Sequence, residues 1–122
     1  MFKSLMILAP LALSTTALAA PAHYTDSQYI AAARCEALMT SDALGKVDSR
    51  GIDAMMKGES RARSPEVQDR ADEARADAIR AVRHAGAYGK AQLVAERDGL
   101  CRALSGAVMS AAADTPAKTG VN

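Results

Sequence analysis

The chain has two cysteines, Cys35 and Cys101, and this pair constrains the fold more than any other feature. In an exported protein an even number of cysteines predicts disulfide bonds, and two cysteines allow one. Such a bond would close a loop around the 65 residues from 36 to 100. In the chain-entropy model a loop of this length stabilises the fold by about 4 kcal/mol. We therefore expect the first and last helices to be neighbours; the alternative is two unpaired, buried thiols.

The expectation of export comes from the first nineteen residues. Lys3 provides the positive charge of a signal peptide, residues 5–13 are apolar, and Ala17-Leu18-Ala19 has the small residues of a cleavage site. Cleavage after Ala19 would leave residues 20–122, enough for one domain, and would make the protein exported and periplasmic. The apolar run is too short to span a bilayer, so we expect no membrane span in the mature form. An uncleaved anchor is the alternative.

The composition argues against several classes of function. The chain has 15 basic and 14 acidic residues, and removal of Lys3 with the signal leaves 14 of each. A neutral domain lacks the basic surface that nucleic acids or anionic membranes attract. With one Phe, three Tyr and no Trp, the core must consist mainly of Ala, Leu, Ile, Val and Met. The aromatic cleft of a glycosidase is also not expected.

The mature sequence shows helical periodicity and no strand-like alternation. Thr25 and Gln28 form a capping box that predicts a helix running to about Leu44 and ending before Gly45. This helix is apolar on nearly all sides, which is typical of a helix in the middle of a bundle. Asp48 predicts the cap of a short second helix that carries Ile52, Met55 and Met56 and ends near Gly58.

The third predicted helix begins with a strong signal, Ser64 as N-cap followed by Pro65, and runs to about Ala85. One face repeats small residues at the spacing of a heptad seam. We expect this alanine seam to pack inside the bundle; the alternative is an interface with another protein or a second copy. The seam consists of Val67, Ala71, Ala74, Ala78, Ala81 and Ala85.

A fourth helix is predicted from about Lys90 to Met109, after a tight joint at residues 86–89. Gly99 and Gly106 within it suggest close backbone contacts. The expected main stripe is Leu93, Leu100, Leu104 and Ala107, with Val94, Cys101 and Val108 beside it. The fold prediction is thus an all-α bundle of three long helices and one short one, with one disulfide joining the first and last. The helical domain is expected at 20–111 and a disordered tail at 112–122.

The sequence contains no motif of catalytic, phosphate-binding or cofactor chemistry, so we expect no enzyme and no cofactor. His84 has two arginines nearby and is interpreted as a solvated residue at a helix end. Acidic and basic residues alternate at pairing distance in the third helix, which favours a solvated surface of ion pairs. The segment 58–64 is interpreted as a hinge, with an exposed recognition loop as the alternative.

Two arrangements would suit copper. Thioethers bind Cu(I), but the methionines fall on apolar faces without a repeated pattern, so we expect them to fill gaps in the core. Cleavage after Ala20 would instead create the terminus Pro21-Ala22-His23, a chelate for Cu(II) or Ni(II). No metal site is predicted. The four methionines outside the signal are Met39, Met55, Met56 and Met109.

These observations favour a small exported, non-enzymatic helical protein that binds another envelope protein. In architecture the chain is similar to small exported helical proteins such as periplasmic acid-stress chaperones, which also carry one disulfide, although it shares no motif with them. That resemblance implies a stress chaperone, or holdase, as the alternative function. A carrier of a small ligand or metal is a further alternative, and the oligomeric state stays open.

Overall fold

The computed structural model describes residues 24–113, and in this range the chain forms helices and their connections without a strand. Two short 3₁₀ turns, Asp42–Leu44 and Ser60–Ala62, come after the first two helices, and a π-helical turn, Arg97–Cys101, joins the last two. The predicted all-α fold is confirmed. The helices are α1 (Asp26–Met39), α2 (Arg50–Glu59), α3 (Pro65–His84), α4 (Ala87–Glu96) and α5 (Arg102–Ala113).

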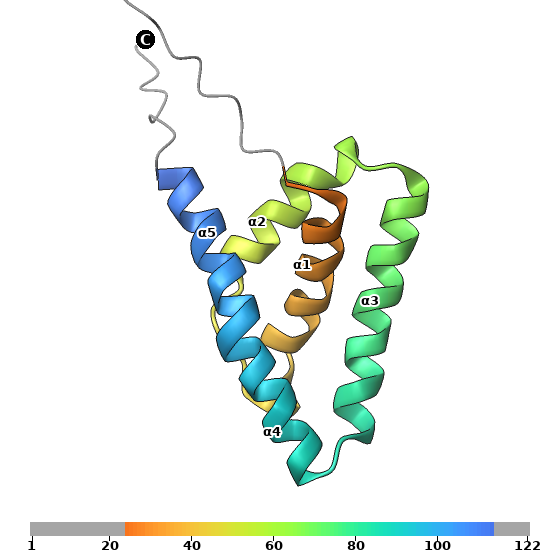
Figure 1. Cartoon of the computed structure of the whole chain (residues 1–122), viewed down its shortest axis with the longest axis vertical. Coiled ribbons are helices and arrows are strands. Elements are labelled where there is room, and N and C mark those ends of the chain that lie inside the picture. Colours follow the sequence, from red (N-terminus) through yellow and green to blue (C-terminus); the bar gives the residue numbers. More distant parts are fainter. Residues whose placement is uncertain (1–23, 114–122) are drawn as a thin grey trace, which may run out of the picture.

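The helices form a V with α1 inside it (Figure 1). One arm of the V is α3, and the other is a continuous rod made of α4, the π-turn and α5. The two arms meet at the joint between α3 and α4 and separate toward the opposite end. The short helix α2 crosses behind α1 and packs against both α1 and α5. None of the described helices has the length and hydropathy that a membrane span needs.

Helix α1 occupies the middle of the bundle, as its nearly uniform apolar surface predicts. Its capping box is present: the Thr25 hydroxyl accepts from the Gln28 amide at 3.1 Å, and the Gln28 side chain accepts from the Thr25 amide at 2.9 Å. The residues of α1 that are buried lie on several sides of the helix, because α2, α3 and the π-turn all contact it. They are Tyr29, Ala32, Ala33, Cys35, Ala37, Leu38 and Met39.

The predicted end of this helix at Leu44 is wrong, because α1 stops at Met39. The hydroxyl of Thr40 donates to the Glu36 carbonyl at 2.7 Å, a local bond that competes with helix continuation. The subsequent 3₁₀ turn ends at Gly45, whose φ of 82° is a conformation that glycine adopts without steric cost. The glycine therefore does stop a helix, although a shorter one than predicted.

Helix α3 begins as predicted, with the Ser64 hydroxyl accepting from the Val67 amide at 3.3 Å and Pro65 as the first helical residue. Its alanine seam faces inward. Ala71 and Ala78 are fully buried, and Ala71 packs with Tyr29 and Ala33 of α1. The small side chains of the seam thus allow α3 to lie close along the central helix.

Helix α2 starts two residues after the predicted cap. The Asp48 carboxylate accepts from the Arg50 amide at 3.1 Å, while Ser49 occupies the N-cap position. Helices α2 and α5 approach closely at Gly51, where a Cβ atom would lie 2.8 Å from the Ser105 hydroxyl of α5. The predicted close contacts at Gly99 and Gly106 are wrong, since an added Cβ at either position meets no atom within 4 Å.

The last predicted helix also differs from expectation, and the π-turn is the reason. The helix begins at Ala87, so the joint consists of Ala85 and Gly86 instead of the expected residues 86–89. In an uninterrupted α-helix Leu100 would share the inward face of Leu93, but the wider π-turn carries an additional residue and rotates the rest of the helix. Cys101 therefore faces the core, whereas the expected core residues Leu100 and Ala107 are exposed.

The predicted signal peptide at 1–19 lies outside the described residues. Helix α5 continues to Ala113, past the predicted domain end at 111. Residues 114–122 of the predicted tail also lie outside the described part of the chain.

Candidate interaction surface

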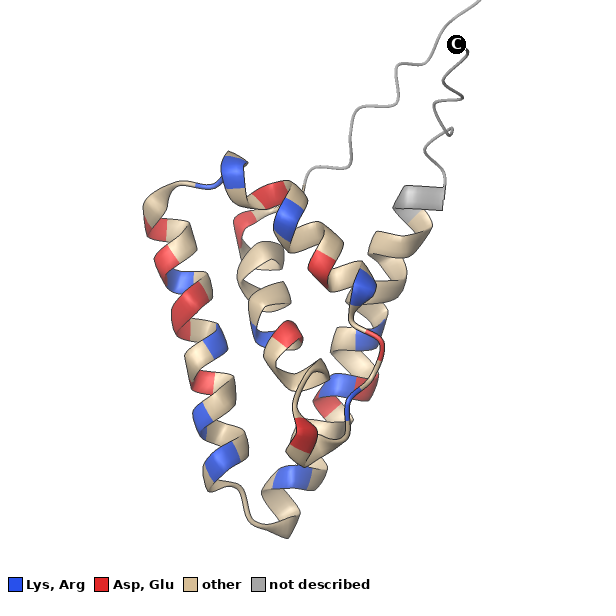
Figure 2. Ribbon diagram, turned by 180° about the vertical axis from the view of Figure 1, so that it is seen from behind, with Lys and Arg blue, Asp and Glu red and all other residues tan. Residues whose placement is uncertain are grey.

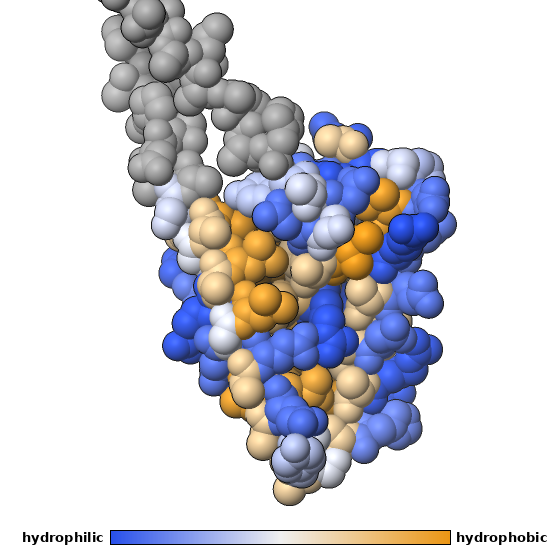
Figure 3. All heavy atoms as spheres, viewed as in Figure 1, coloured by the Kyte–Doolittle hydropathy of each residue, from blue (hydrophilic) through white to orange (hydrophobic). Residues whose placement is uncertain are grey.

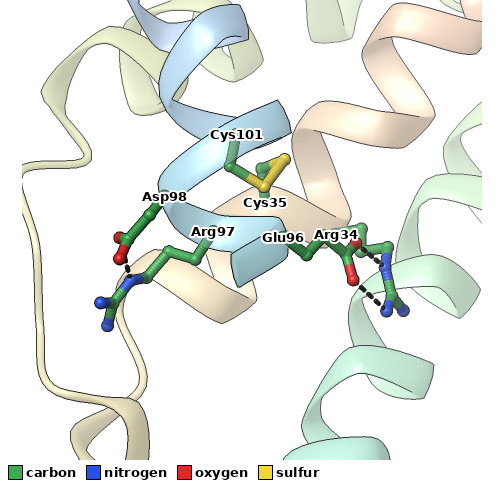
Figure 4. Close-up of a disulfide and its surroundings, with 6 residues drawn as sticks. All are labelled: Arg34, Cys35, Glu96, Arg97, Asp98 and Cys101. Atoms are coloured by element: carbon green, nitrogen blue, oxygen red, sulfur yellow. Dashed lines mark hydrogen bonds and ion pairs between the residues drawn. A yellow bond between two sulfur atoms is a disulfide. The ribbon is translucent and has the colours of Figure 1, made fainter. Parts of the chain in front are cut away.

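The disulfide between Cys35 and Cys101 joins α1 to the π-turn (Figure 4). The two Cα atoms lie 5.3 Å apart, and both side chains are buried. Because the π-turn rotates Cys101 toward α1, the bond forms at the centre of the molecule. The predicted pairing is confirmed, and it holds the rod of α4 and α5 against the central helix.

Arg97 is a buried charged residue that the sequence analysis did not identify. Only 8% of its surface is exposed, and its guanidinium donates to the Leu44 and Gly45 carbonyls, both at 2.6 Å. Its Nε also donates to Asp98 at 3.0 Å, and this hydrogen bond lowers the pKa of the Asp98 carboxyl below its usual value (Figure 4). One side chain thereby fixes the loop after α1 to the rod. Its spacing of four residues from both Leu93 and Cys101 is the signal that could have revealed an inward position.

A second ion pair fastens the rod from the other side. Arg34 of α1 donates two hydrogen bonds to the Glu96 carboxylate, at 2.6 Å and 3.0 Å (Figure 4). The hydrogen bond with Glu96 raises the pKa of the Arg34 guanidinium above its ordinary value. Bidentate pairs of this kind fix orientation as well as distance. The disulfide, the hydrogen bonds of Arg97 and this ion pair together hold the start of α5 against α1 and the loop that follows α1.

Beyond Arg102, the exposed residues of α5 as far as Ser110 carry no charge. Arg102 is the last charged residue of the helix, and α5 is tan beyond it in Figure 2. Leu100 and Met109 expose 62% and 52% of their surface, and the other exposed residues between Arg102 and Ser110 are small. We call this surface the α5 face; it consists of Leu100, Ala103, Gly106, Ala107, Met109 and Ser110.

The rest of the surface differs sharply from the α5 face. In the space-filling view, apolar residues gather along α5 and beside α1, whereas the side formed by α3 is hydrophilic (Figure 3). The ion pairs predicted on α3 are present and exposed, including Arg70 with Glu66 and Arg75 with Asp72. Exposed pairs of this kind contribute little to stability and keep a surface solvated. Covering the α5 face would therefore remove exposed apolar surface from water, whereas covering the α3 side would remove solvated charges.

A groove of about 280 Å³ adjoins the α5 face on the side of α2. Met39 and Val47 contribute apolar atoms, and Met109 stands at its edge. Asp48 lies in the same groove, and its hydrogen bonds from Arg50 lower the pKa of its carboxyl to about 2. The groove thus combines apolar atoms with charged side chains of both signs, Asp48, Arg97 and Arg102.

A larger groove, of about 540 Å³, lies between α1, α2 and α3. Its volume suits a small ligand. Its central polar groups, however, bind one another: Arg75 donates to Glu36 at 3.0 Å, and Asp53 accepts from the Ser49 hydroxyl at 3.0 Å. Polar groups that are already paired offer less to a ligand, so this groove supports a carrier function only weakly.

The connector between α2 and α3 is anchored through Arg63. Its guanidinium donates to Asp26 at 2.6 Å, to Glu59 at 2.5 Å and to the Tyr24 carbonyl, and it stacks over Tyr29 with 5.5 Å to the ring centroid. A segment held by a largely buried side chain fits the interpretation as a joint between helices better than that of a free recognition loop.

The residues considered for metal chemistry do not gather into one site. Met39 and Met55 are buried in the core, as expected for gap-filling residues, while Met109 is half exposed. His84 is exposed at the end of α3. In the described range no three His, Cys, Asp or Glu side chains form a group that could hold a metal ion. The Pro21-Ala22-His23 chelate lies outside that range.

Comparison with known proteins gives no relative: no family model, no curated protein and no solved structure matches this chain.

Proposed function

We propose that this protein is an exported, non-enzymatic adaptor that binds another envelope protein through the α5 face. The observation that carries the proposal is an uncharged, exposed helix side on a molecule whose other long arm, α3, is densely charged. Exposed apolar surface on a small protein is typical of an interaction site. Export is inferred from residues 1–19 and from the cysteine pair.

The chemistry of the surface indicates the kind of partner. Ala103, Gly106, Ala107 and Ser110 are small, so a second helix can approach α5 closely along this side. Leu100 lies on the same stripe and can enter a gap between the side chains of that helix, whereas Met109 lies across α5 from Leu100, at the groove beside α2. The partner that fits this surface best is an amphipathic helix whose apolar face lies against α5, as in the helix-in-groove mode of recognition.

Site-specific cross-linking in the envelope tests this proposal. A photo-cross-linking residue in place of Ala103 should form an adduct of one defined mass, and the attached peptide should come from an amphipathic helix. Leu100→Asp should reduce this adduct about tenfold or more, because a central apolar contact is replaced by a charge. The matched control is Tyr88→Asp, at the far end of the rod, where the native side chain is 78% exposed.

The result also separates an adaptor from a holdase. A holdase would bind many unfolded chains, so cross-linking from Ala103 would give a broad smear that strengthens under stress, and the purified protein would suppress aggregation. A single adduct that Leu100→Asp removes supports the adaptor. An unchanged adduct in Leu100→Asp, or none above background, refutes it.

A further inference from the structure

The outer side of α3 has an ordered distribution of charge. Six exposed residues occupy the side opposite the buried alanines Ala71 and Ala78, as the helical period requires. On this side of α3 the acidic residues lie in the first half and the arginines in the second half; along the helix as a whole red and blue are interspersed in Figure 2, with blue at the end next to α4. We call this surface the α3 face; it consists of Asp69, Asp72, Glu73, Ala76, Arg80 and Arg83.

The charges are also almost symmetrically spaced about one small residue. Asp69 and Arg83 each lie seven residues from Ala76, and Glu73 and Arg80 lie three and four residues from it on one flank of the helix. The helix dipole explains why acids come first and arginines last. It does not require near-equal spacing about a centre. Near-equal spacing with opposite sign is the pattern that makes a helix face complementary to an antiparallel copy of itself.

We propose that two copies of this chain associate through their α3 faces, with the helices antiparallel and the two-fold axis at Ala76. With a rise of 1.5 Å per residue, Asp69 and Arg83 lie about 10 Å on either side of that axis. Each Asp69 is then opposite Arg83 of the other copy, and each Glu73 lies on the same flank of the contact as Arg80 of the other copy. Four intermolecular ion pairs result, because the two-fold axis repeats each of the two pairings once.

The side chains needed for these pairs are available. Asp69 and Arg83 have no ion-pair partner within the described part of the chain, and both are exposed. Glu73 likewise has no ion-pair partner there, and Arg80 is paired within α3 to Asp77, an exposed pair of the kind that exchanges readily.

The centre of the contact is suited to close packing. The Ala76 methyl groups of the two copies would meet at the axis, and a small residue there allows the helices to approach to about 8 Å. Ile79 lies beside the face with 47% of its surface exposed and would add an apolar contact on each side of the axis. One helix side is small for a stable interface, so we expect a reversible dimer that added salt weakens.

This proposal does not depend on the α5 face, which belongs to the other arm of the V. A dimer formed through α3 would leave both α5 faces uncovered and would present two binding surfaces to partners. Failure of the cross-linking from Ala103 would therefore not count against the α3 dimer, and a monomeric protein would not count against binding through the α5 face.

Charge reversal tests the proposed pairing directly. The purified, oxidised full chain is examined by sedimentation velocity at low ionic strength over a range of concentrations. Wild type should dimerise, and Asp69→Arg and Arg83→Asp should each be monomeric, because each places like charges opposite one another. An equimolar mixture of the two variants should dimerise again, since every reversed charge then faces an opposite one.

Lys90→Glu is the matched control, because it reverses an exposed charge on α4 and should leave the dimer intact. Circular dichroism confirms that each variant is folded. A monomeric wild type, single variants that dimerise as wild type does, or a mixture that stays monomeric would each overturn the proposal.

Discussion

Arg97 shows how one buried side chain can determine the path of a loop. The Leu44 and Gly45 carbonyls lie at the end of a 3₁₀ turn, and the Leu44 carbonyl is in a buried site where it needs a donor. The guanidinium carries five N–H donors spread over a planar group, so it reaches both carbonyls and Asp98 at once. Arg97 is therefore best understood as a structural residue that keeps the segment before α2 in place.

Replacing Arg97 with Met should lower the free energy of unfolding by about 2 kcal/mol. The methionine would preserve most of the packing of the stem, but the Leu44 carbonyl would lose its charged donor, and an unsatisfied buried acceptor costs about 1–3 kcal/mol. Urea denaturation measures the change. Arg102→Met, on the exposed side of α5, is the control and should alter stability by less than about 0.5 kcal/mol. Equal effects of the two substitutions would contradict the assigned role.

At the scale of elements, α1 and α3 are held together by small side chains. Ala71 and Ala78 are buried against the central helix, so the contact depends on the absence of larger groups. The same principle operates at Gly51, where α2 meets Ser105 of α5. Packing in this molecule is set more by close helix approach than by large apolar residues.

Ala78→Leu should overpack this contact and lower the free energy of unfolding by roughly 1–3 kcal/mol. A thermal melt measures the shift, and Ala91→Leu on the exposed side of α4 is the control. An unchanged midpoint for Ala78→Leu would mean that the seam is not a tight internal contact.

The sequence predicted the elements whose signals are local. The Thr25 capping box and the Ser64-Pro65 start lie where expected because each depends on a few adjacent residues. The π-turn could not be predicted, because its cause is tertiary: the bond to Cys35 and the bonds of Arg97 hold the turn in place. Cys101 and Val108 are buried as expected, but the turn places Leu100 and Ala107 outside, which is why Leu100 was misplaced in the core and the α5 face was missed.

At the scale of the whole molecule, the disulfide contributes most of the stability that a thin core does not supply. Cys35→Ala combined with Cys101→Ala should lower the free energy of unfolding by about 4 kcal/mol, the loop-closure value for a bond of this span. Chemical denaturation of the oxidised protein and of the double variant measures the difference. A loss below about 1 kcal/mol would show that the helices hold the bundle without the bond.

The position of the same bond also determines how the protein responds to pulling. The described chain starts and finishes at one end of the V, at the beginning of α1 and the end of α5 (Figure 1). Tension applied between Tyr24 and Ala113 passes through the sulfur atoms and bypasses residues 36–100. The stretched chain can then reach a length of only about 80 Å, against about 300 Å for the same span without the bond. A pull on both ends would strain α1 and α5 and leave α2, α3 and α4 unloaded, and the bond would set the maximum length of the stretched chain.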